Sequence, residues 1–322
     1  MGAEGGHTWN IHPFPPGAGD GRTGEYSPIS PSIYPSLPPP PAGGGAGGGH
    51  TRTLVHCRPA AAGAAGAAMA ARTVLLTGSN RGIGLELVKQ LLAAPRPPAW
   101  LFATCREPEG PRAQELRDLA SKHPNLVLVK LDVADPSAIA DAAKVVEGKL
   151  NGAGLNLLIN NAGIYNPTAS LETADAEEMI KAYKTNAVGP MLTAQAFLPL
   201  LKKAARESTE KGLSCSKAAI INISTVMGSI ERTPESFFKP VIPYRCSKAA
   251  LNMLTKCQAL TYGKDGILCV ALHPGWVKTD MGSQEADLTV DTSVRGLLSV
   301  LVTLSEKHGG TLLNWEGKAI PW

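Results

Sequence analysis

The 322-residue sequence predicts a doubly wound α/β domain, with about seven strands in one parallel sheet and helices on both faces. Three observations predict it. Apolar segments of strand length alternate with segments rich in helix-forming residues along residues 69–322. These apolar segments are continuous rather than alternating with polar residues, which is typical of parallel strands buried on both faces. A glycine-rich turn lies directly between the first such strand and the first helix.

The expected strands are short and rich in leucine, isoleucine and valine. They comprise residues 73–77, 101–104, 126–130, 155–160, 218–224, 267–273 and 310–314. The expected helices follow them at residues 85–94, 112–122, 137–149, 175–203, 244–262 and 290–306. In a sheet of this kind, ligands bind at the carboxyl ends of the strands.

Residues 1–68 differ in composition from the rest of the chain, because they hold 15 of the 34 Gly and 11 of the 26 Pro, together with 11 Ala. Such a segment buries too little apolar surface to offset its chain entropy. We therefore expect a disordered Gly/Pro/Ala-rich tail before a single catalytic domain at 69–322. An acid-poor stretch at 50–68 leaves an organelle transit peptide open, and a translation start at Met69 is a further alternative.

Charge and hydropathy exclude several classes of protein. The formal net charge is only +4 and no run of like charges occurs, which argues against a nucleic-acid ligand. No apolar stretch approaches the roughly 20 residues of a membrane-spanning helix, so we expect a cytoplasmic protein without a membrane span. The six cysteines include no CxxC pair, which predicts reduced thiols and no metal site.

The turn TGSNRGIG at residues 77–84 predicts a phosphate-binding site. Glycines here allow a tight turn and the close approach of a pyrophosphate to the backbone. The following helix start supplies free N–H groups and a favourable dipole. The candidate residues in this turn are Gly78, Asn80, Arg81, Gly82, Ile83 and Gly84.

The residues at the end of the second strand distinguish between two dinucleotides. A carboxylate about 20 residues beyond the glycines would bind the adenosine ribose hydroxyls of NAD. Here Cys105 holds that place and Arg106 follows it. Arg81 and Arg106 can pair with a 2′-phosphate, which favours NADP(H) as the cofactor, while Glu107 leaves ribose binding open.

Five ordered motifs resemble the short-chain dehydrogenase/reductase family. They are TGSNRGIG, NNAG at 160–163, Asn186, Tyr244-x-x-x-Lys248 and PGWVKT at 274–279. Within the family, YRCSKAALN, HPGWVKTDMG and TLLNWEGKAIPW are similar to the sniffer-type, or C-factor-like, carbonyl reductases. The resemblance implies a Rossmann-type fold and an NADPH-dependent oxidoreductase that reduces carbonyl compounds. Members of the family are homodimers or monomers, so the resemblance leaves the oligomeric state open.

The same resemblance implies a role for each matching residue. Tyr244 would be the general acid of carbonyl reduction, Lys248 would also bind the nicotinamide ribose, and the backbone of Asn186 would help to hold a water in the proton relay. The further residues implied to bind the cofactor are Asp132, Val133, Asn160, Ala162, Gly163, Pro274, Gly275, Val277 and Thr279.

The spacing of Tyr244 and Lys248 also makes chemical sense, because residues four apart lie on one face of a helix. An ammonium ~4 Å from a phenol contributes roughly 4 kcal/mol at an effective dielectric constant of about 20. That energy corresponds to about 3 pKa units. We therefore expect Lys248 alone to lower the pKa of Tyr244 towards neutrality.

In the segment NISTVMG at 222–228, the position of the family's catalytic serine is held by Thr225, and Ser224 precedes it. Adjacent strand residues point to opposite faces, so only one of the two hydroxyls faces the substrate. We favour Thr225 and keep Ser224 as the alternative. The additional methyl group of threonine is expected to change the tolerance for substrates.

The link at residues 229–243 is longer than is usual in the family. Its Phe237, Phe238, Val241 and Ile242 are expected to add apolar surface where a substrate enters, which favours an apolar carbonyl compound. A loop packed on the rim of the site is the alternative. Two functions follow from the sequence: a carbonyl reductase acting on aldehydes, ketones or quinones, and an NADP(H)-binding signalling or regulatory protein with little or no turnover.

Overall fold

The structure is a computed structural model that describes residues 71–166, 170–236 and 240–322. The predicted tail at 1–68 lies outside the described residues, as do Phe237 and Phe238 of the long link. The tail and the domain boundary at residue 69 therefore stay predictions. Among the described helices, none is long and apolar enough to cross a membrane.

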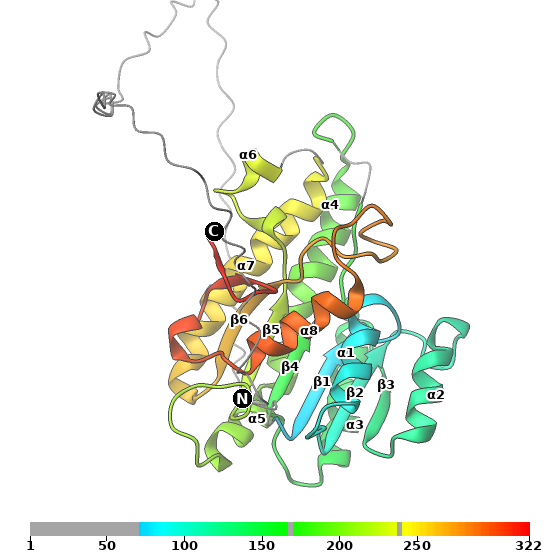
Figure 1. The fold of residues 1–322 in the computed structure, drawn as a ribbon, viewed down its shortest axis with the longest axis vertical. Helices are drawn as coiled ribbons and strands as arrows, with labels where there is room; N and C mark the ends of the chain where they lie inside the picture. Colours follow the sequence, from blue (N-terminus) through cyan, green and yellow to red (C-terminus); the bar gives the residue numbers. More distant parts are fainter. Residues whose placement is uncertain (1–70, 167–169, 237–239) are drawn as a thin grey trace, which may run out of the picture. The chain divides into compact units, whose positions relative to one another are not determined.

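The described strands form one sheet. They are β1 (Thr73–Thr77), β2 (Trp100–Cys105), β3 (Leu126–Lys130), β4 (Leu157–Asn160), β5 (Ala219–Ile223), β6 (Leu268–His273), β7 (Leu312–Asn314) and β8 (Ala319–Ile320). Their order across the sheet is β3-β2-β1-β4-β5-β6-β7-β8 (Figure 1). The seven expected strands all pair in parallel, and β8 adds an antiparallel partner to β7.

Helices connect most of the strands. The α-helices are α1 (Gly82–Leu92), α2 (Gln114–Lys122), α3 (Pro136–Leu150), α4 (Ala176–Tyr183), α5 (Gly189–Glu207), α6 (Thr233–Ser236), α7 (Ile242–Tyr262) and α8 (Val290–Leu301). Short 3-10 turns are η1 (Pro111–Ala113), η3 (Val226–Gly228), η4 (Gly263–Asp265) and η5 (Glu306–His308), and η2 (Lys184–Val188) is π-helical.

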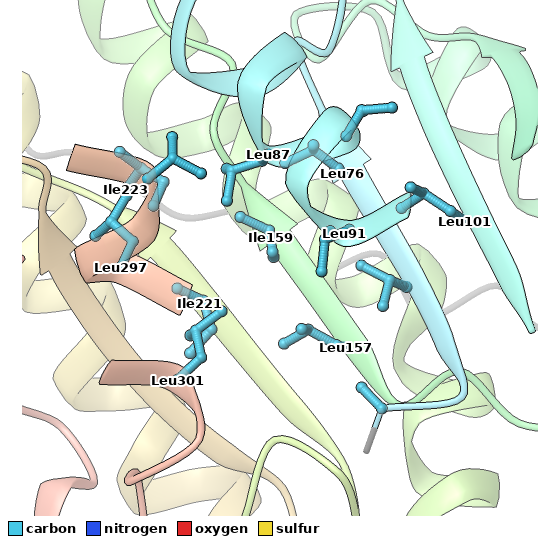
Figure 2. Close-up of a cluster of buried hydrophobic side chains, with 14 of the residues drawn as sticks. Leu76, Leu87, Leu91, Leu101, Leu157, Ile159, Ile221, Ile223, Leu297 and Leu301 are labelled. Carbon is cyan, nitrogen blue, oxygen red and sulfur yellow. The ribbon is translucent and has the colours of Figure 1, made fainter. Parts of the chain in front are cut away.

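Two hydrophobic clusters, one on each face of the sheet, confirm the doubly wound α/β class. In β1, Val74 and Leu76 belong to the first cluster and Leu75 to the second, as the alternation of strand side chains requires. Figure 2 shows the first cluster, in which leucines of α1 lie near Leu76 and Ile159 and leucines of α8 lie near Ile221 and Ile223. The second cluster contains residues of α3 and α5. Continuous apolar strands are therefore buried on both faces.

The strand order reverses beside β1, which has β2 on one side and β4 on the other. At such a switch point the connecting segments diverge and leave a crevice at the carboxyl ends of the strands, where α/β proteins bind ligands. The segment 77–84 follows β1 and the segment 160–163 ends β4. Both predicted motifs therefore meet at the switch point.

Three local features differ from the expectations. The strand β8 and the helix α6 were not expected, because segments of two and four residues carry too little periodicity to be recognised. The single helix expected at 175–203 is divided into α4, the π-helical η2 and α5. Pro190 lacks the N–H group that a continuous α-helix would use there, which explains the division.

Candidate active site

The turn between β1 and α1 has room only for glycine at two positions. Gly78 has a φ of +68°, and a Cβ atom added there would lie 2.9 Å from Ala162 Cα. A Cβ atom on Gly84 would lie 2.0 Å from the Gly78 carbonyl oxygen. The chain therefore folds closely on itself and against the end of β4, as the sequence motif predicts.

The helix that follows begins with N–H groups that no side chain caps. Its N-cap, Arg81, makes no side-chain cap hydrogen bond, and the first turn from Gly82 contains no acidic residue. The first N–H groups of a helix have no partner within the helix and bind anions well. Asn80 is half-buried beside them, and Ile83 packs on the first hydrophobic cluster. This donor set fits a pyrophosphate.

Ser79 ties the glycine-rich turn to the end of β2. Its buried hydroxyl donates to the Leu76 carbonyl oxygen at 2.8 Å and accepts from the Thr104 N–H at 3.2 Å. The Ser79 N–H donates to the Thr104 carbonyl oxygen at 2.9 Å. This link places Arg106, two residues further on, at the same edge as the turn. We did not single out Ser79 from the sequence, although a hydroxyl among glycines was an available signal.

The two predicted arginines are exposed at this edge. Arg81 Nη1 pairs with Asp280 Oδ2 at 2.8 Å, and both side chains are largely in solvent. An exposed ion pair of this kind contributes at most about 1 kcal/mol, so the Arg81 guanidinium can also pair with a phosphate. Glu107 is exposed as well. A 2′-phosphate therefore has two candidate cationic partners here.

The segment NNAG ties β4 to its neighbours. Asn160 Nδ2 donates to Asn222 Oδ1 on β5 at 2.9 Å. Asn161 Nδ2 donates to the carbonyl oxygens of Thr77 and Gly78, each at 3.0 Å, and the Ala162 N–H donates to the Thr77 hydroxyl. These bonds hold the ends of β1, β4 and β5 together. Asn161, the second residue of the predicted NNAG motif, fastens the glycine-rich turn directly.

The other cofactor candidates lie along the same edge. Asp132 follows β3 and accepts the Ala134 N–H at 2.9 Å, whereas Val133 is buried in the second hydrophobic cluster and can reach a ligand only through its backbone. A Cβ atom added to Gly82 would lie 3.4 Å from Thr279 Cγ2, so the PGWVKT segment borders the glycine-rich turn. The backbone bridge between Val277 and Leu288 shapes that segment. The remaining candidates in this region are Gly163, Pro274 and Gly275.

Tyr244 and Lys248 both lie buried in the first half of α7. The Lys248 ammonium donates to the Ile223 carbonyl oxygen at the end of β5, at 2.8 Å, and lies 5.8 Å from the centroid of the Tyr244 ring. Tyr244 is 9% exposed. The helix thus places the phenol and the ammonium on one face, as their spacing predicts.

The expected lowering of the Tyr244 pKa is wrong. Burial raises the pKa of Tyr244 above its ordinary value, with a smaller contribution from Tyr165. Burial also lowers the pKa of Lys248 to about 8. The estimate from the sequence counted the attraction between ammonium and phenolate but not the cost of desolvating two charged groups. Tyr244 is therefore a protonated phenol at neutral pH, which is the form a proton donor needs.

The hydroxyls of Ser224 and Thr225 point to different partners. The Ser224 hydroxyl donates to Asn252 Oδ1 of α7 at 2.5 Å, and Asn252 Nδ2 donates to the Gly228 carbonyl oxygen. The Thr225 hydroxyl accepts the Met227 N–H at 3.2 Å as the N-cap of η3. The proton of Ser224 is thus already donated within the fold, and Thr225 stays our prediction for the hydroxyl that faces the substrate. Asn252 was not noticed in the sequence, where it looks like an ordinary helix residue.

Asn186 lies in η2 and is fully buried. Its amide Oδ1 accepts the Ile164 N–H at 2.8 Å, and its Nδ2 donates to the Ile164 carbonyl oxygen at 2.9 Å. The same Nδ2 also donates to the Ser247 hydroxyl on α7 at 3.0 Å. The side chain thus connects the loop after β4 with the helix that carries Tyr244, a contact that the spacing of motifs did not reveal.

The apolar residues expected at the substrate entrance are only partly where we expected them. Val241 is buried rather than exposed, so the expectation for this residue is wrong, and Ile242 is half-buried. Val241 adopts a φ of +37° as the N-cap of α7, and this turn directs its side chain inwards. Ile230, in contrast, is highly exposed, and the neighbouring Glu231 N–H donates to the Trp322 carbonyl oxygen.

Within the described residues, no group of acidic, histidine and cysteine side chains could hold a metal ion.

Comparison with known proteins identifies the class of this molecule. Residues 72–288 match the family described as short chain dehydrogenase, and the chain belongs to that family. The structure resembles the NADPH bound carbonyl reductase from chicken fatty liver, with a TM-score of 0.75 and 58% identity over 78% of this chain and 99% of that one. It also resembles the carbonyl reductase Sniffer of D. melanogaster, with a TM-score of 0.75 and 41% identity over 78% of this chain and 100% of that one. The resemblance inferred from the motifs is thereby confirmed.

The chain is also similar to a protein that is not named as a reductase. The C-signal protein of Myxococcus xanthus is 33% identical over 168 residues, which cover 52% of this chain and 93% of that protein. Together with the family match, the carbonyl reductase neighbours show that the chain is an oxidoreductase of the short-chain dehydrogenase family.

Proposed function

We propose that this chain is an NADPH-dependent carbonyl reductase that acts on an aldehyde, ketone or quinone. The observation that carries the proposal is the buried Tyr244 and Lys248 pair, whose lysine bonds to the end of β5 two residues before Thr225. This cluster belongs to the same sheet edge as the glycine-rich turn. The 58% identity to the NADPH bound carbonyl reductase from chicken fatty liver supports the proposal.

The residues at the edge of the sheet fit NADPH. The uncapped N–H groups at the start of α1 would hold the pyrophosphate, and Arg81 and Arg106 would pair with the 2′-phosphate. Asp132 would bind the adenine, and Lys248 and Thr279 would hold the nicotinamide end. When bound, NADPH supplies the hydride for the carbonyl carbon.

The side chains of the chain itself would handle the oxygen of the substrate. The Thr225 hydroxyl accepts the Met227 N–H and so keeps its own proton free to donate to the carbonyl oxygen. Tyr244, kept protonated by burial, would transfer a proton to that oxygen as negative charge develops on it. The nearby Lys248 ammonium stabilises the phenolate that remains.

The test is an activity assay in which the oxidation of NADPH is measured with a panel of aldehydes, ketones and quinones. The assay compares the full chain with its Tyr244→Phe variant. Removing only the hydroxyl deletes the proton donor, and we expect kcat to fall by about 10²–10⁴-fold while NADPH binding is kept. Tyr183→Phe is a matched control, because Tyr183 is an exposed tyrosine on α4. Equal turnover by Tyr244→Phe and the parent would contradict the assignment of the general acid.

The rival function is an NADP(H)-binding signalling or regulatory protein, which the similarity to C-signal favours. It predicts that NADPH binds but that no carbonyl compound in the panel is reduced. Intact Tyr244 and Lys248 favour the reductase.

Four further expectations stay predictions: the apolar nature of the substrate, a cytoplasmic location, the absence of a nucleic-acid partner and assembly as a homodimer.

A further inference from the structure

A second tyrosine packs directly against the proposed proton donor. Tyr165 lies in the loop after β4, and its ring meets that of Tyr244 edge to face, with centroids 5.0 Å apart and an angle of 84° between the planes. None of the sequence motifs includes Tyr165. The contact therefore adds an aromatic side chain to the site that the motifs did not predict.

The backbone that carries Tyr165 is held by a buried network. Both the N–H and the carbonyl oxygen of Ile164, the preceding residue, bond to the Asn186 amide. The same amide bonds to Ser247, whose hydroxyl donates to the Tyr244 carbonyl oxygen at 2.8 Å. These bonds hold the backbone directly before Tyr165 in place relative to α7.

The exposure of the two rings indicates what Tyr165 can touch. Tyr244 is almost fully covered, whereas Tyr165, which packs against it, is half-buried. Because the two ring centroids are 5.0 Å apart, a carbonyl compound that is hydrogen-bonded to the Tyr244 hydroxyl would approach Tyr165 as well. The group attached to the carbonyl carbon would then lie against Tyr165.

We propose that Tyr165 is a specificity-determining residue that favours carbonyl compounds carrying a flat aromatic group over those carrying a saturated ring of the same size. The proposal rests on the function proposed above. Aromatic rings attract one another through offset or edge-to-face contacts, and this preference beyond simple burial amounts to about a two- to tenfold change in binding. A saturated ring gains the burial but not the aromatic contact.

The test compares two aldehydes that differ only in the saturation of the ring, benzaldehyde and cyclohexanecarbaldehyde. The measured quantity is the ratio of their kcat/KM values in the full chain and in Tyr165→Leu and Tyr165→Phe. The ratio in each variant is divided by the ratio in the unmodified chain, so the different intrinsic reactivity of the two aldehydes cancels. Tyr183→Leu, on the exposed face of α4, is the matched control for loss of a tyrosine.

We expect Tyr165→Leu to lower the ratio of the aromatic to the saturated kcat/KM value by about two- to tenfold, and Tyr165→Phe and Tyr183→Leu to leave it unchanged. An equal loss for both aldehydes in Tyr165→Leu would show that Tyr165 only positions Tyr244, and would overturn the proposal. An equally large decrease of this kcat/KM ratio in Tyr165→Phe and in Tyr165→Leu would also overturn the proposal. The hydroxyl of Tyr165, and not its ring, would then cause the preference for the aromatic aldehyde.

A binding measurement separates this proposal from the proposed function. Isothermal titration of benzyl alcohol and cyclohexylmethanol into the full chain with saturating NADPH gives a ratio of dissociation constants without turnover, because an alcohol and NADPH are both reduced and cannot react. If no aldehyde is reduced but Tyr165→Leu lowers the preference for benzyl alcohol, the proposed function fails and the inference about Tyr165 stands. An unchanged binding ratio in Tyr165→Leu overturns the inference, whatever the turnover.

Discussion

In Tyr244 and Lys248, burial disfavours the charged form of each side chain. It raises the pKa of Tyr244 and lowers the pKa of Lys248 to about 8. The phenol is therefore protonated throughout the neutral and mildly alkaline range, whereas the lysine loses its ammonium charge slightly above neutral pH. On the alkaline side, the charge of Lys248 rather than that of Tyr244 is expected to limit carbonyl reduction.

The pH dependence of kcat/KM tests this expectation. The ammonium is fully present well below its pKa and is lost as the pH rises through about 8, so kcat/KM should fall roughly tenfold between pH 7 and pH 9. Lys248→Arg keeps a positive charge throughout this range and should remove the alkaline fall, even if its absolute rate is lower. Initial rates of NADPH oxidation at subsaturating substrate provide the measurement. An alkaline fall of the same size in Lys248→Arg would assign it to another group.

At the scale of the elements, the passage from β5 into η3 separates two neighbouring hydroxyls. Ser224 continues the strand and bonds to Asn252 of α7, whereas Thr225 caps the 3-10 turn. The strand alternation predicts that the two side chains diverge, but it does not say which one meets α7. Only the packing of α7 against this end of β5 decides between them.

Alanine substitutions at these two positions should have different effects. Thr225→Ala removes the proposed donor to the carbonyl oxygen and should lower kcat by about 10²-fold, while the lost cap of η3 should cost about 0.5–2 kcal/mol of stability. Ser224→Ala leaves the buried Asn252 Oδ1 without this donor and should cost about 1–3 kcal/mol of stability. Thr225→Ser is the matched control and should keep activity.

Denaturant unfolding and steady-state kinetics measure the two effects separately. A large loss of kcat in Ser224→Ala, with normal turnover by Thr225→Ala, would reverse the assignment. Ser224 would then be the hydroxyl that contacts the substrate, so the two variants decide between the alternatives whichever result is found.

At the scale of the whole molecule, the strand order brings distant residues together. Because β1 and β2 are neighbours and run in parallel, the turn after β1 and the residues after β2 lie at the same edge of the sheet. This topology, fastened by Ser79 and Thr104, gives Arg81 and Arg106 a common location although they are far apart in the chain. The preference for NADPH is therefore expected to depend on this edge.

Arg106→Asp tests that preference. Replacing a guanidinium by a carboxylate beside a 2′-phosphate should weaken NADPH binding by about 10- to 100-fold and NADH binding by less than about threefold. Arg112→Asp makes the same change of charge at another exposed arginine and controls for long-range electrostatics. Fluorescence titration of both cofactors gives the dissociation constants. Equal losses for NADPH and NADH would contradict contact with the phosphate.

Much of this architecture could be predicted from the sequence, because buried parallel strands and a glycine-rich turn have strong local patterns. All seven expected strands pair in parallel, and the turn has the tight backbone that its glycines predict. The contacts that join distant segments had no local signal, such as Ser224 with Asn252 or Tyr165 with Tyr244. The sign of the Tyr244 pKa shift also depended on burial, which motif spacing does not report.

The small strand β8 has a consequence for the behaviour of the protein at high concentration. A sheet whose last strand is unpaired offers a row of free N–H and carbonyl groups to another chain, which promotes aggregation. Here β8 pairs antiparallel with β7, Leu312 opposite Ile320 and Leu313 opposite Ala319, and it is only two residues long. An edge this short offers few groups for a foreign strand, so β8 protects this side of the sheet against intermolecular pairing.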